Sequence, residues 1–423
     1  MSEFLLLKNA RPYGEGGITD LLIKDGKIVE IAQNLTLAEF KACVNADGSA
    51  TYTDISTVID CKGLPLIPAA VDVHTHTRTP GFEHKEDAVS FSNAAAKGGV
   101  SCVMAMPNTN PVPDSIENLK EIQTALRNGK TRIYFFAAIT KGSNGRELTD
   151  ISLLSKQPCI KGFSDDGRGV TDIALLKKAV IRANQNGKII AAHSESTNPD
   201  FEKRETEAVL QEVAMLRELQ EAGKKPKYHF CHISNREALE SVIAARKDGI
   251  DVTFEVTPHH FSLTKSDIKN TNYKMSPPLR EETDKTAILH AIASGAATIV
   301  ATDHAPHTED EKARGYDNAP NGIIGLETLI PLVYTELVKT GIISLRTASR
   351  LITDNPASRF GLPFGEISVT GLADLVVPDT ETTRIYTKAE IQSKSKNSPF
   401  IGRELTGFPV LTIVNGKVVY NNL

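Results

Sequence analysis

The sequence predicts an α/β protein, a TIM-type (β/α)8 barrel with a small β-sandwich domain formed by the N- and C-terminal segments. Between about residue 68 and residue 367, strand-like apolar runs alternate with helical stretches eight times, which is the pattern of a parallel barrel. Both chain ends carry short apolar strands and tight-turn signals instead. We therefore expect a barrel over residues 68–367 and a composite β-domain from residues 1–67 plus 368–423.

Each predicted barrel unit begins with a short apolar strand. We expect these strands at residues 71–74, 101–106, 133–139, 159–163, 189–193, 229–232, 252–256 and 298–302. Helical patches such as "DAVSFSNAAAKGG" and "NREALESVIAARKDG" lie between them, and several end in glycine, as helix C-termini commonly do. Near the chain ends, "KDGKIV" and "VNGKVV" place Asp-Gly and Asn-Gly between alternating apolar residues, which predicts two tight hairpins.

The composition is that of a globular enzyme. The 423 residues include 48 basic and 52 acidic side chains, so no broad basic face for nucleic acid is expected. No run of about 18 apolar residues predicts a membrane span, and the apolar stretch in "EFLLLKNA" is too short for a signal peptide. The five cysteines, Cys43, Cys61, Cys102, Cys159 and Cys231, show no paired spacing, which favours reduced thiols and a cytoplasmic location.

Polar residues follow the predicted strands at the end where barrel enzymes keep their chemistry. Side chains two apart on a strand share a face, so His74 and His76 can reach one point in space. The other residues at this end are Asn108, Ser164, Asp165, Asp166, His193, His232 and Asp303. Histidines scattered through a core would not all fall at the same end of their strands.

Four histidines and one or two carboxylates at a barrel mouth match the ligands that Zn²⁺ accepts. A further oxygen ligand could bridge a second ion about 3.5–4 Å from the first, and such a pair activates water and polarises a carbonyl. The remaining histidines are expected to be structural: His84 on the surface, His229 facing outward, His290 on a helix, and the "TPHH" pair at 257–260.

Several motifs together resemble the longer bacterial type of the dihydroorotase family, in the amidohydrolase superfamily. They are "DVHTHTRTPGFEHKED", "MPNTNP", "FSDDG", "HSE", "CHIS", "PPLR", "ATDHAPH" and "APNGIIGLET", and the resemblance covers nearly the whole chain. It implies a zinc enzyme of pyrimidine biosynthesis that interconverts N-carbamoyl-L-aspartate and (S)-dihydroorotate. It also implies a homodimer and an association with aspartate transcarbamoylase as candidate assemblies.

The resemblance assigns roles to individual residues. The implied metal ligands are His74, His76, His193, His232 and Asp303, with a bridging carboxylate from the fourth strand, and Asp303 is also the implied proton shuttle. The implied contacts to the substrate carboxylate are Arg78, Asn108 and His307, while the loop at Asn321 and Gly322 offers backbone groups to the ring. Ser276 stands where the family usually has a substrate-binding asparagine, so a single hydroxyl replaces an amide there.

Three alternatives stay open at this point. The bridging ligand is either Asp166 or a carboxylated Lys161, and the intact Asp-Asp-Gly run favours Asp166, with one or two metal ions bound. The polar loop 307–322 is either a cover over the mouth or a static connection. The function is either that of the family it resembles, that of another cyclic-amide hydrolase such as an allantoinase or dihydropyrimidinase, or that of a non-catalytic scaffold. Arg78 argues against the second, and the complete ligand set argues against the third.

Overall fold

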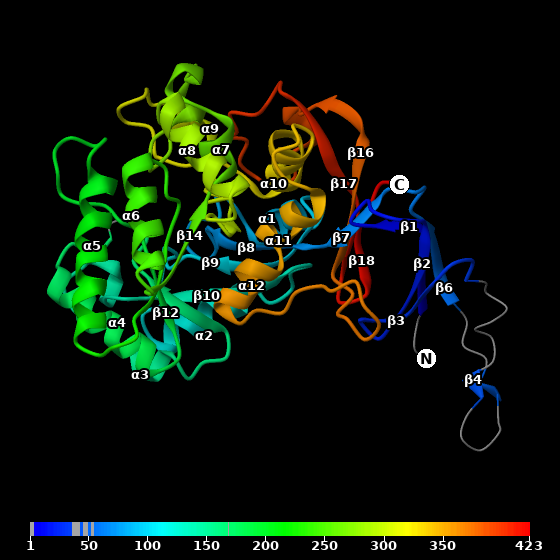
Figure 1. The fold of residues 1–423 in the computed structure, drawn as a ribbon, viewed down its shortest axis with the longest axis horizontal. Helices are drawn as coiled ribbons and strands as arrows, with labels where there is room; N and C mark the ends of the chain where they lie inside the picture. The colour runs from blue at the N-terminus through cyan, green and yellow to red at the C-terminus, as the bar shows by residue number, and fades with distance from the viewer. Residues whose placement is uncertain (1–3, 36–42, 45–49, 52–54, 168) are drawn as a thin grey trace.

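The computed structural model describes residues 4–35, 43–44, 50–51, 55–167 and 169–423. They form two large sheets: a parallel barrel that helices surround, and a mixed sheet built from both ends of the chain (Figure 1). The predicted fold class is confirmed.

All eight predicted barrel strands are present. They are β8 (Ala70–Thr75), β9 (Val100–Ala105), β10 (Arg132–Ala138), β11 (Ile160–Ser164), β12 (Ile189–Ala192), β13 (Lys227–Phe230), β14 (Asp251–Val256) and β15 (Ile299–Val300). Neighbours in this order pair in parallel from β8 to β15. The barrel is nearly closed, because a bridge joins Thr75 to His304 and the Thr302 amide donates to Asp72 at 3.1 Å.

Helices alternate with these strands and cover the outside of the barrel (Figure 1). They are α1 (Ala88–Lys97), α2 (Ile116–Ala125), α3 (Ile151–Leu154), α4 (Ile173–Gln185), α5 (Arg204–Glu221), α6 (Arg236–Lys247), α7 (Pro258–Ser262), α8 (Glu282–Ala293), α9 (Glu309–Lys312), α10 (Leu329–Val333), α11 (Leu345–Ile352) and α12 (Asp354–Phe360). Side chains cap several N-termini, as Asp87 does for α1 and Asn235 for α6. Gly187, Gly249 and Gly295 have positive φ just past α4, α6 and α8, which explains the glycines of the helical patches.

The second sheet joins the two chain ends. Its strands are β1 (Phe4–Pro12), β2 (Thr19–Lys24), β3 (Lys27–Ala32), β6 (Ile55–Asp60), β7 (Pro65–Pro68), β16 (Leu375–Ile385), β17 (Glu404–Val414) and β18 (Lys417–Asn421), and a separate short pair is β4 (Cys43–Val44) with β5 (Ala50–Thr51). Both predicted hairpins form: β2 with β3 at Asp25-Gly26, and β17 with β18 at Asn415-Gly416, all four turn residues having positive φ.

Three clusters of buried apolar side chains support the barrel and the β-domain. The largest cluster lies between the barrel strands and the helices. A second fills the barrel interior, where Phe360 and Leu362 pack among strand residues such as Val73 and Phe136. A third brings β1, β2 and β6 together with β16 and β17, so the strands of the β-domain enclose a core of their own. At the junction, β7 pairs with both β1 and β16 and is followed directly by the barrel strand β8. The exact domain boundaries stay a prediction.

In the described part of the chain, the structure shows no helix with the length and apolar character needed to cross a membrane. Cys61, Cys102, Cys159 and Cys231 are free thiols.

Candidate active site

A cavity of about 360 Å³ lies where the barrel strands end. Most of the residues predicted from the sequence to form the site line it: His76, Arg78, Asn108, Asp166, His193, His232, Ser276, Asp303, His307, Asn321 and Gly322. His74 is fully buried and belongs to the same cluster through its contacts. The structure therefore brings together all the residues of the predicted site.

His74 lies in β8, and His76 directly follows this strand. The Nδ1 atom of His74 contacts a carboxylate oxygen of Glu255, so its Nε2 atom faces the other ligands and lies 3.3 Å from Nε2 of His193. His76 Nε2 lies 2.9 Å from an oxygen of Asp303, which is also 3.4 Å from His74 Nε2. One Asp303 oxygen therefore faces both histidines of the His-x-His motif.

Two overlapping groups of donors could each hold a metal ion. In one, nitrogens of His74, His193 and His232 lie within 4.8 Å of one another, and in the other the donors are His74, His76 and Asp303. The rings of His74, His193 and His232 have centroids 4.9–5.1 Å apart. Imidazole nitrogens with carboxylate oxygens at this spacing are a donor set that suits zinc.

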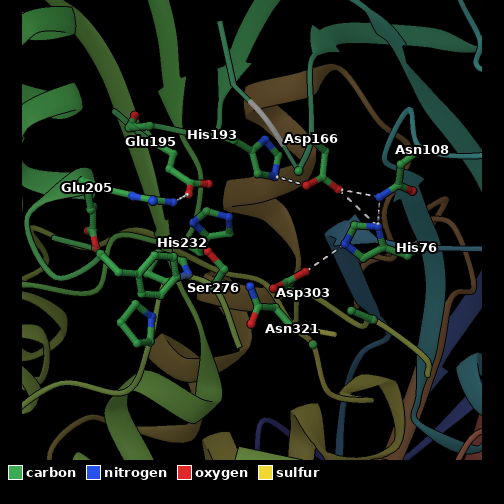
Figure 2. A pocket seen from close by; sticks show the side chains of 18 of the residues that line it. His76, Asn108, Asp166, His193, Glu195, Glu205, His232, Ser276, Asp303 and Asn321 are labelled. Atoms are coloured by element: carbon green, nitrogen blue, oxygen red, sulfur yellow. Dashed lines mark hydrogen bonds and ion pairs between the residues drawn. The ribbon is translucent and has the colours of Figure 1, made fainter. Parts of the chain in front are cut away.

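Asp166 lies between the two groups of histidines (Figure 2). One of its oxygens is 3.1 Å from His193 Nε2, and the other is 3.2 Å from His76 Nδ1 and accepts a hydrogen bond from Asn108 at 2.9 Å. Burial alone would raise the pKa of Asp166, but His193 and His76 hold this pKa below its usual value. Gly167, with φ +85°, follows it in a conformation that favours glycine.

Lys161 lies outside this cluster. Its ammonium group donates to the carbonyl of Gly361 at 3.0 Å and lies 4.8 Å from the ring centroid of Tyr134. Neither Lys161 nor these two partners line the cavity, so the Lys161 side chain in this position does not reach between His76 and His193.

The protonation of the histidines fits a metal site. Burial lowers the pKa of His193 to about 3 and also lowers the pKa of His232, so both rings are neutral and offer lone pairs. Burial opposes protonation of His74 as well, but Glu255 and Asp303 outweigh it and raise the pKa of His74 well above its ordinary value. This excess of negative charge around one buried ring is what a divalent cation neutralises in place of a proton.

Asp303 stays ionised in the same environment. Burial would raise its pKa, but His74, His76 and His232 hold the pKa of Asp303 far below its usual range. Its backbone has φ +50°, in the left-handed region, as have those of His232 (+32°) and Arg78 (+58°). Such positive φ values in residues other than glycine are uncommon and often mark functional sites.

Arg78 and His307 lie together in another part of the cavity. The Arg78 side chain, whose residue is 9% exposed, donates through Nε to the Pro306 carbonyl at 3.1 Å and through Nη2 to His307 Nε2 at 3.2 Å. Burial and the neighbouring cations, Arg78 first and then Lys85, lower the pKa of His307, so its ring is neutral. Arg78 therefore supplies a buried positive charge beside the histidine cluster.

Asn108 contacts two residues of the cluster, His76 and Asp166. Its amide nitrogen lies 2.7 Å from His76 Nδ1 as well as donating to Asp166, and its Oδ1 atom is buried with no hydrogen-bond partner among the described residues. In this orientation Oδ1 can accept from a ligand N–H. Donation to a ligand carboxylate, the role implied for Asn108, requires the amide to turn over.

The loop side of the cavity carries the remaining predicted residues. Ser276, Asn321 and Gly322 line it, and Ser276 and Asn321 lie near Asp303 in Figure 2. Gly322 has φ +128°, and a Cβ atom there would come within 2.6 Å of the Ala305 Cβ. A glycine is thus required for the close approach of this loop to the strand end.

Several residues that shape the site carry no sequence signal of their own. Glu255, an internal residue of β14, binds His74 and also contacts His229 at 3.1 Å. The expectation that His229 faces outward is wrong: it is fully buried, within hydrogen-bonding distance of Thr253 as well as Glu255. Strand alternation with Cys231, which lies in the barrel interior, could have identified this.

Two arginines that line the cavity were also missed. Arg204 pairs with Glu195 at 2.8 Å, and Arg280, the last residue of the "PPLR" motif, donates to Glu205 and Ser234, each at 2.9 Å. The acidic partners neutralise both cations, which distinguishes them from Arg78.

Comparisons with known proteins agree with this geometry. A family described as "Dihydro-orotase-like" matches residues 63–210. The chain is 38% identical to a dihydroorotase of Bacillus thuringiensis (strain Al Hakam) and 39% identical to one of Bacillus cytotoxicus, in each case over 98% of both chains.

Solved structures with the same fold include an L-hydantoinase (dihydropyrimidinase) from Arthrobacter aurescens, with a TM-score of 0.84 at 24% identity, covering 100% of this chain and 97% of that one. A dihydropyrimidinase from Brevibacillus agri gives a TM-score of 0.81 at 21% identity, covering 100% and 95%. At this identity the likeness concerns the fold alone.

Proposed function

The chain belongs to the dihydroorotase family, and from this premise we propose that it interconverts N-carbamoyl-L-aspartate and (S)-dihydroorotate, a reaction of pyrimidine biosynthesis. It is a metal-dependent cyclic amidohydrolase. The observation that carries the proposal is the shared cavity, in which a buried guanidinium lies beside the histidine and carboxylate cluster. The same cavity can thus hold the ring carboxylate and the amide bond that reacts.

The metal is zinc, and two ions fit the donors. His74, His76 and Asp303 would serve one ion and His193 and His232 the other, with Asp166 between them, since its two oxygens face His76 and His193 separately. Bound there, zinc activates water and polarises the amide carbonyl. The position of Lys161 against Gly361 supports Asp166 rather than a carboxylated lysine as the bridge.

The chain's own side chains then account for binding and proton transfer. Arg78, with His307 beside it, holds the ring carboxylate, because a guanidinium can form two parallel hydrogen bonds to it. Asn108 joins this contact when its amide has turned over. Asp303, ionised and close to both histidines of the motif, accepts the proton of the attacking water and delivers it to the departing ring nitrogen. In the direction of synthesis, the same carboxylate removes the proton from the carbamoyl nitrogen.

The test measures zinc content and ring opening of dihydroorotate on the same preparation, the latter by ultraviolet absorbance. We expect hydrolysis that stops on chelation and returns with zinc, at two zinc ions per chain. A protein that holds zinc and leaves dihydroorotate intact would refute the proposed function, whereas one zinc with full activity would refute only the paired site.

A further inference from the structure

The segment between β16 and β17 leaves the β-domain and lies against the mouth of the barrel. We name residues 391–400 the C-terminal strap; a single 3₁₀ turn (Lys388–Glu390) precedes it, and it contains no helix or strand. Ile391 and Phe400, at its two ends, are buried in a cluster with Met275, Ile323 and Ile324 from the barrel loops. The strap thus belongs to the C-terminal segment in sequence and packs with the barrel loops in space.

Buried side chains replace the backbone pairing that the strap lacks. Glu86, which is fully buried, accepts from the Lys394 amide at 2.9 Å and from the Ser393 hydroxyl. Glu327 accepts from the Gln392 and Ser393 amides at 2.8 and 3.1 Å. The strap is therefore fixed to the barrel at its first half. Farther along it, the Ser395 hydroxyl donates to the Lys85 carbonyl at 2.6 Å, and Asn397 forms the anchor nearest the cavity loops.

Both the amide nitrogen and the amide oxygen of the Asn397 side chain form hydrogen bonds. Its Nδ2 donates to the carbonyls of Ala305 and Gly322, each at 3.0 Å, and its Oδ1 accepts from the amide of His307 at 3.1 Å. Its backbone carbonyl accepts from Ile324 at 3.0 Å. At 2% exposure the side chain has no water to replace these partners.

The three groups that Asn397 joins belong to two segments, which line the cavity near Arg78. Ala305 and His307 follow the last barrel strand, and Gly322 lies in the loop that returns past it. The Arg78 guanidinium contacts the His307 ring in turn. Any shift between these segments would change how His307 and Gly322, which both line the cavity, are placed relative to one another.

We propose that Asn397 is a positioning residue for substrate binding: the strap's amide holds the His307 segment and the Gly322 segment at the spacing that the substrate requires. This inference rests on the proposed function for the identity of the substrate. Only an amide of this length meets the requirement, because two donors and one acceptor must diverge from one short side chain. An aspartate would keep the acceptor and face two carbonyl oxygens with a carboxylate.

The test compares Asn397→Asp and Asn397→Ala with wild type, as zinc-loaded full-length enzymes. We expect KM for dihydroorotate to rise about tenfold in both variants, as expected for the loss of one or two buried hydrogen bonds, with kcat changed less than about threefold. Zinc content should not change. The matched control is Asn184→Asp, because Asn184 also donates to two carbonyls, of Lys188 and Lys227, and accepts from an amide, far from the cavity.

Wild-type KM in both Asn397 variants would overturn the inference, and so would loss of zinc or an equal rise in KM in the Asn184 control. Wild-type enzyme without activity on dihydroorotate would instead refute the proposed function. Hydrogen exchange on unmodified enzyme provides a test that needs no variant: the amides of His307 and Ile324 should be protected. Rapid exchange of both would overturn the inference even if the variants did not fold.

Discussion

Glu255 shows how much of the site depends on residues behind the ligands. It is fully buried, and it holds the Nδ1 atom of His74 while contacting His229 on its other oxygen. A carboxylate in this position fixes the tautomer of a metal-binding histidine and increases its basicity. His74 is thereby committed to presenting Nε2 to the other ligands.

Replacing Glu255 by glutamine should weaken zinc binding by about 10- to 100-fold, because the amide no longer supplies the negative charge. Competition with a chelator of known affinity measures this directly. The matched control is Glu212→Gln, which alters a buried glutamate that binds Ser194 and Tyr228 and no proposed ligand. Equal zinc affinity in Glu255→Gln and wild type would show that the contact has no role in metal binding.

Two variants test which residue bridges the metal ions. Asp166→Ala should lose about half of the bound zinc and almost all activity, since both groups of ligands face this carboxylate. Lys161→Ala should keep its zinc, because Lys161 contacts Gly361 and Tyr134 instead. Metal analysis of the purified variants decides the matter, and the reverse pattern would identify a carboxylated lysine.

Sequence patterns predicted the strand-terminal residues of the cluster because each lies where an apolar run ends. They gave no indication that Asp303, His232 and Arg78 have left-handed backbone conformations, which depend on how each strand end meets its neighbours. Glu255 and His229 were missed for a related reason. Interior polar residues of a barrel stand among apolar ones, and only their contacts distinguish them.

At the level of elements, periodicity was sufficient for the eight barrel strands and for the helices between them. Short apolar runs and glycine-terminated helices predict parallel units whatever their long-range contacts. The C-terminal strap could not be predicted, because it has no regular structure and its bonds connect residues far apart in sequence, such as Lys394 and Glu86. The buried serines Ser393 and Ser395 alternate along it, but the role of this alternation is visible only from the barrel residues that they bind.

The loop 307–322 is held at several points, which favours the static alternative. Lys312 is buried and donates to the carbonyls of Lys274 and Pro320 at 3.1 and 2.9 Å, while Glu311 pairs with Lys85 at 3.0 Å. The Gly322 amide also donates to Lys274 at 3.0 Å.

We therefore expect hydrogen exchange in residues 308–312, which lie outside the proposed substrate contacts, to change little when a substrate analogue binds. Exchange measured by mass spectrometry with and without the ligand tests this expectation. The exposed turn at residues 313–318 serves as an internal reference for rapid exchange. A large gain in protection across the whole loop would show that it closes over the mouth.

At the scale of the whole molecule, a buried acid makes stability depend on pH. Burial raises the pKa of Glu212 from 4.5 to about 7, against the hydrogen bonds from Ser194 and Tyr228. Between these values the folded state binds more protons than the unfolded chain, so the free energy of unfolding falls as pH rises from about 4.5 to about 7. The contribution of Glu212 to stability is therefore fully present below about pH 4.5 and is lost above about pH 7.

Glu212→Gln should remove this loss, because an amide oxygen can accept both hydrogen bonds without ionising. Relative to wild type, the variant should gain roughly 2 to 3 kcal/mol in free energy of unfolding between pH 5 and pH 8. Urea unfolding of the zinc-loaded proteins at the two pH values measures this difference. The same difference at both would show that Glu212 titrates normally.

The fold class followed from the sequence as a whole, since eight repeated units leave few architectures open. What the sequence did not supply is the relation between parts: the near closure through Thr302 and Asp72, and the strap that connects the C-terminal segment to the mouth. Both depend on contacts between residues far apart in sequence, such as Thr302 with Asp72 and Lys394 with Glu86, for which local patterns carry no information.

The central claim is that one cavity combines a metal cluster with a carboxylate anchor at Arg78. The most direct measurement is kcat/KM for dihydroorotate and for dihydrouracil, which lacks the carboxylate, in wild type and Arg78→Ala. Wild type should prefer dihydroorotate, and the variant should lose on the order of a hundredfold for dihydroorotate alone, with zinc content unchanged. A wild-type preference for dihydrouracil, or an Arg78→Ala variant that loses zinc and keeps its selectivity, would contradict the account.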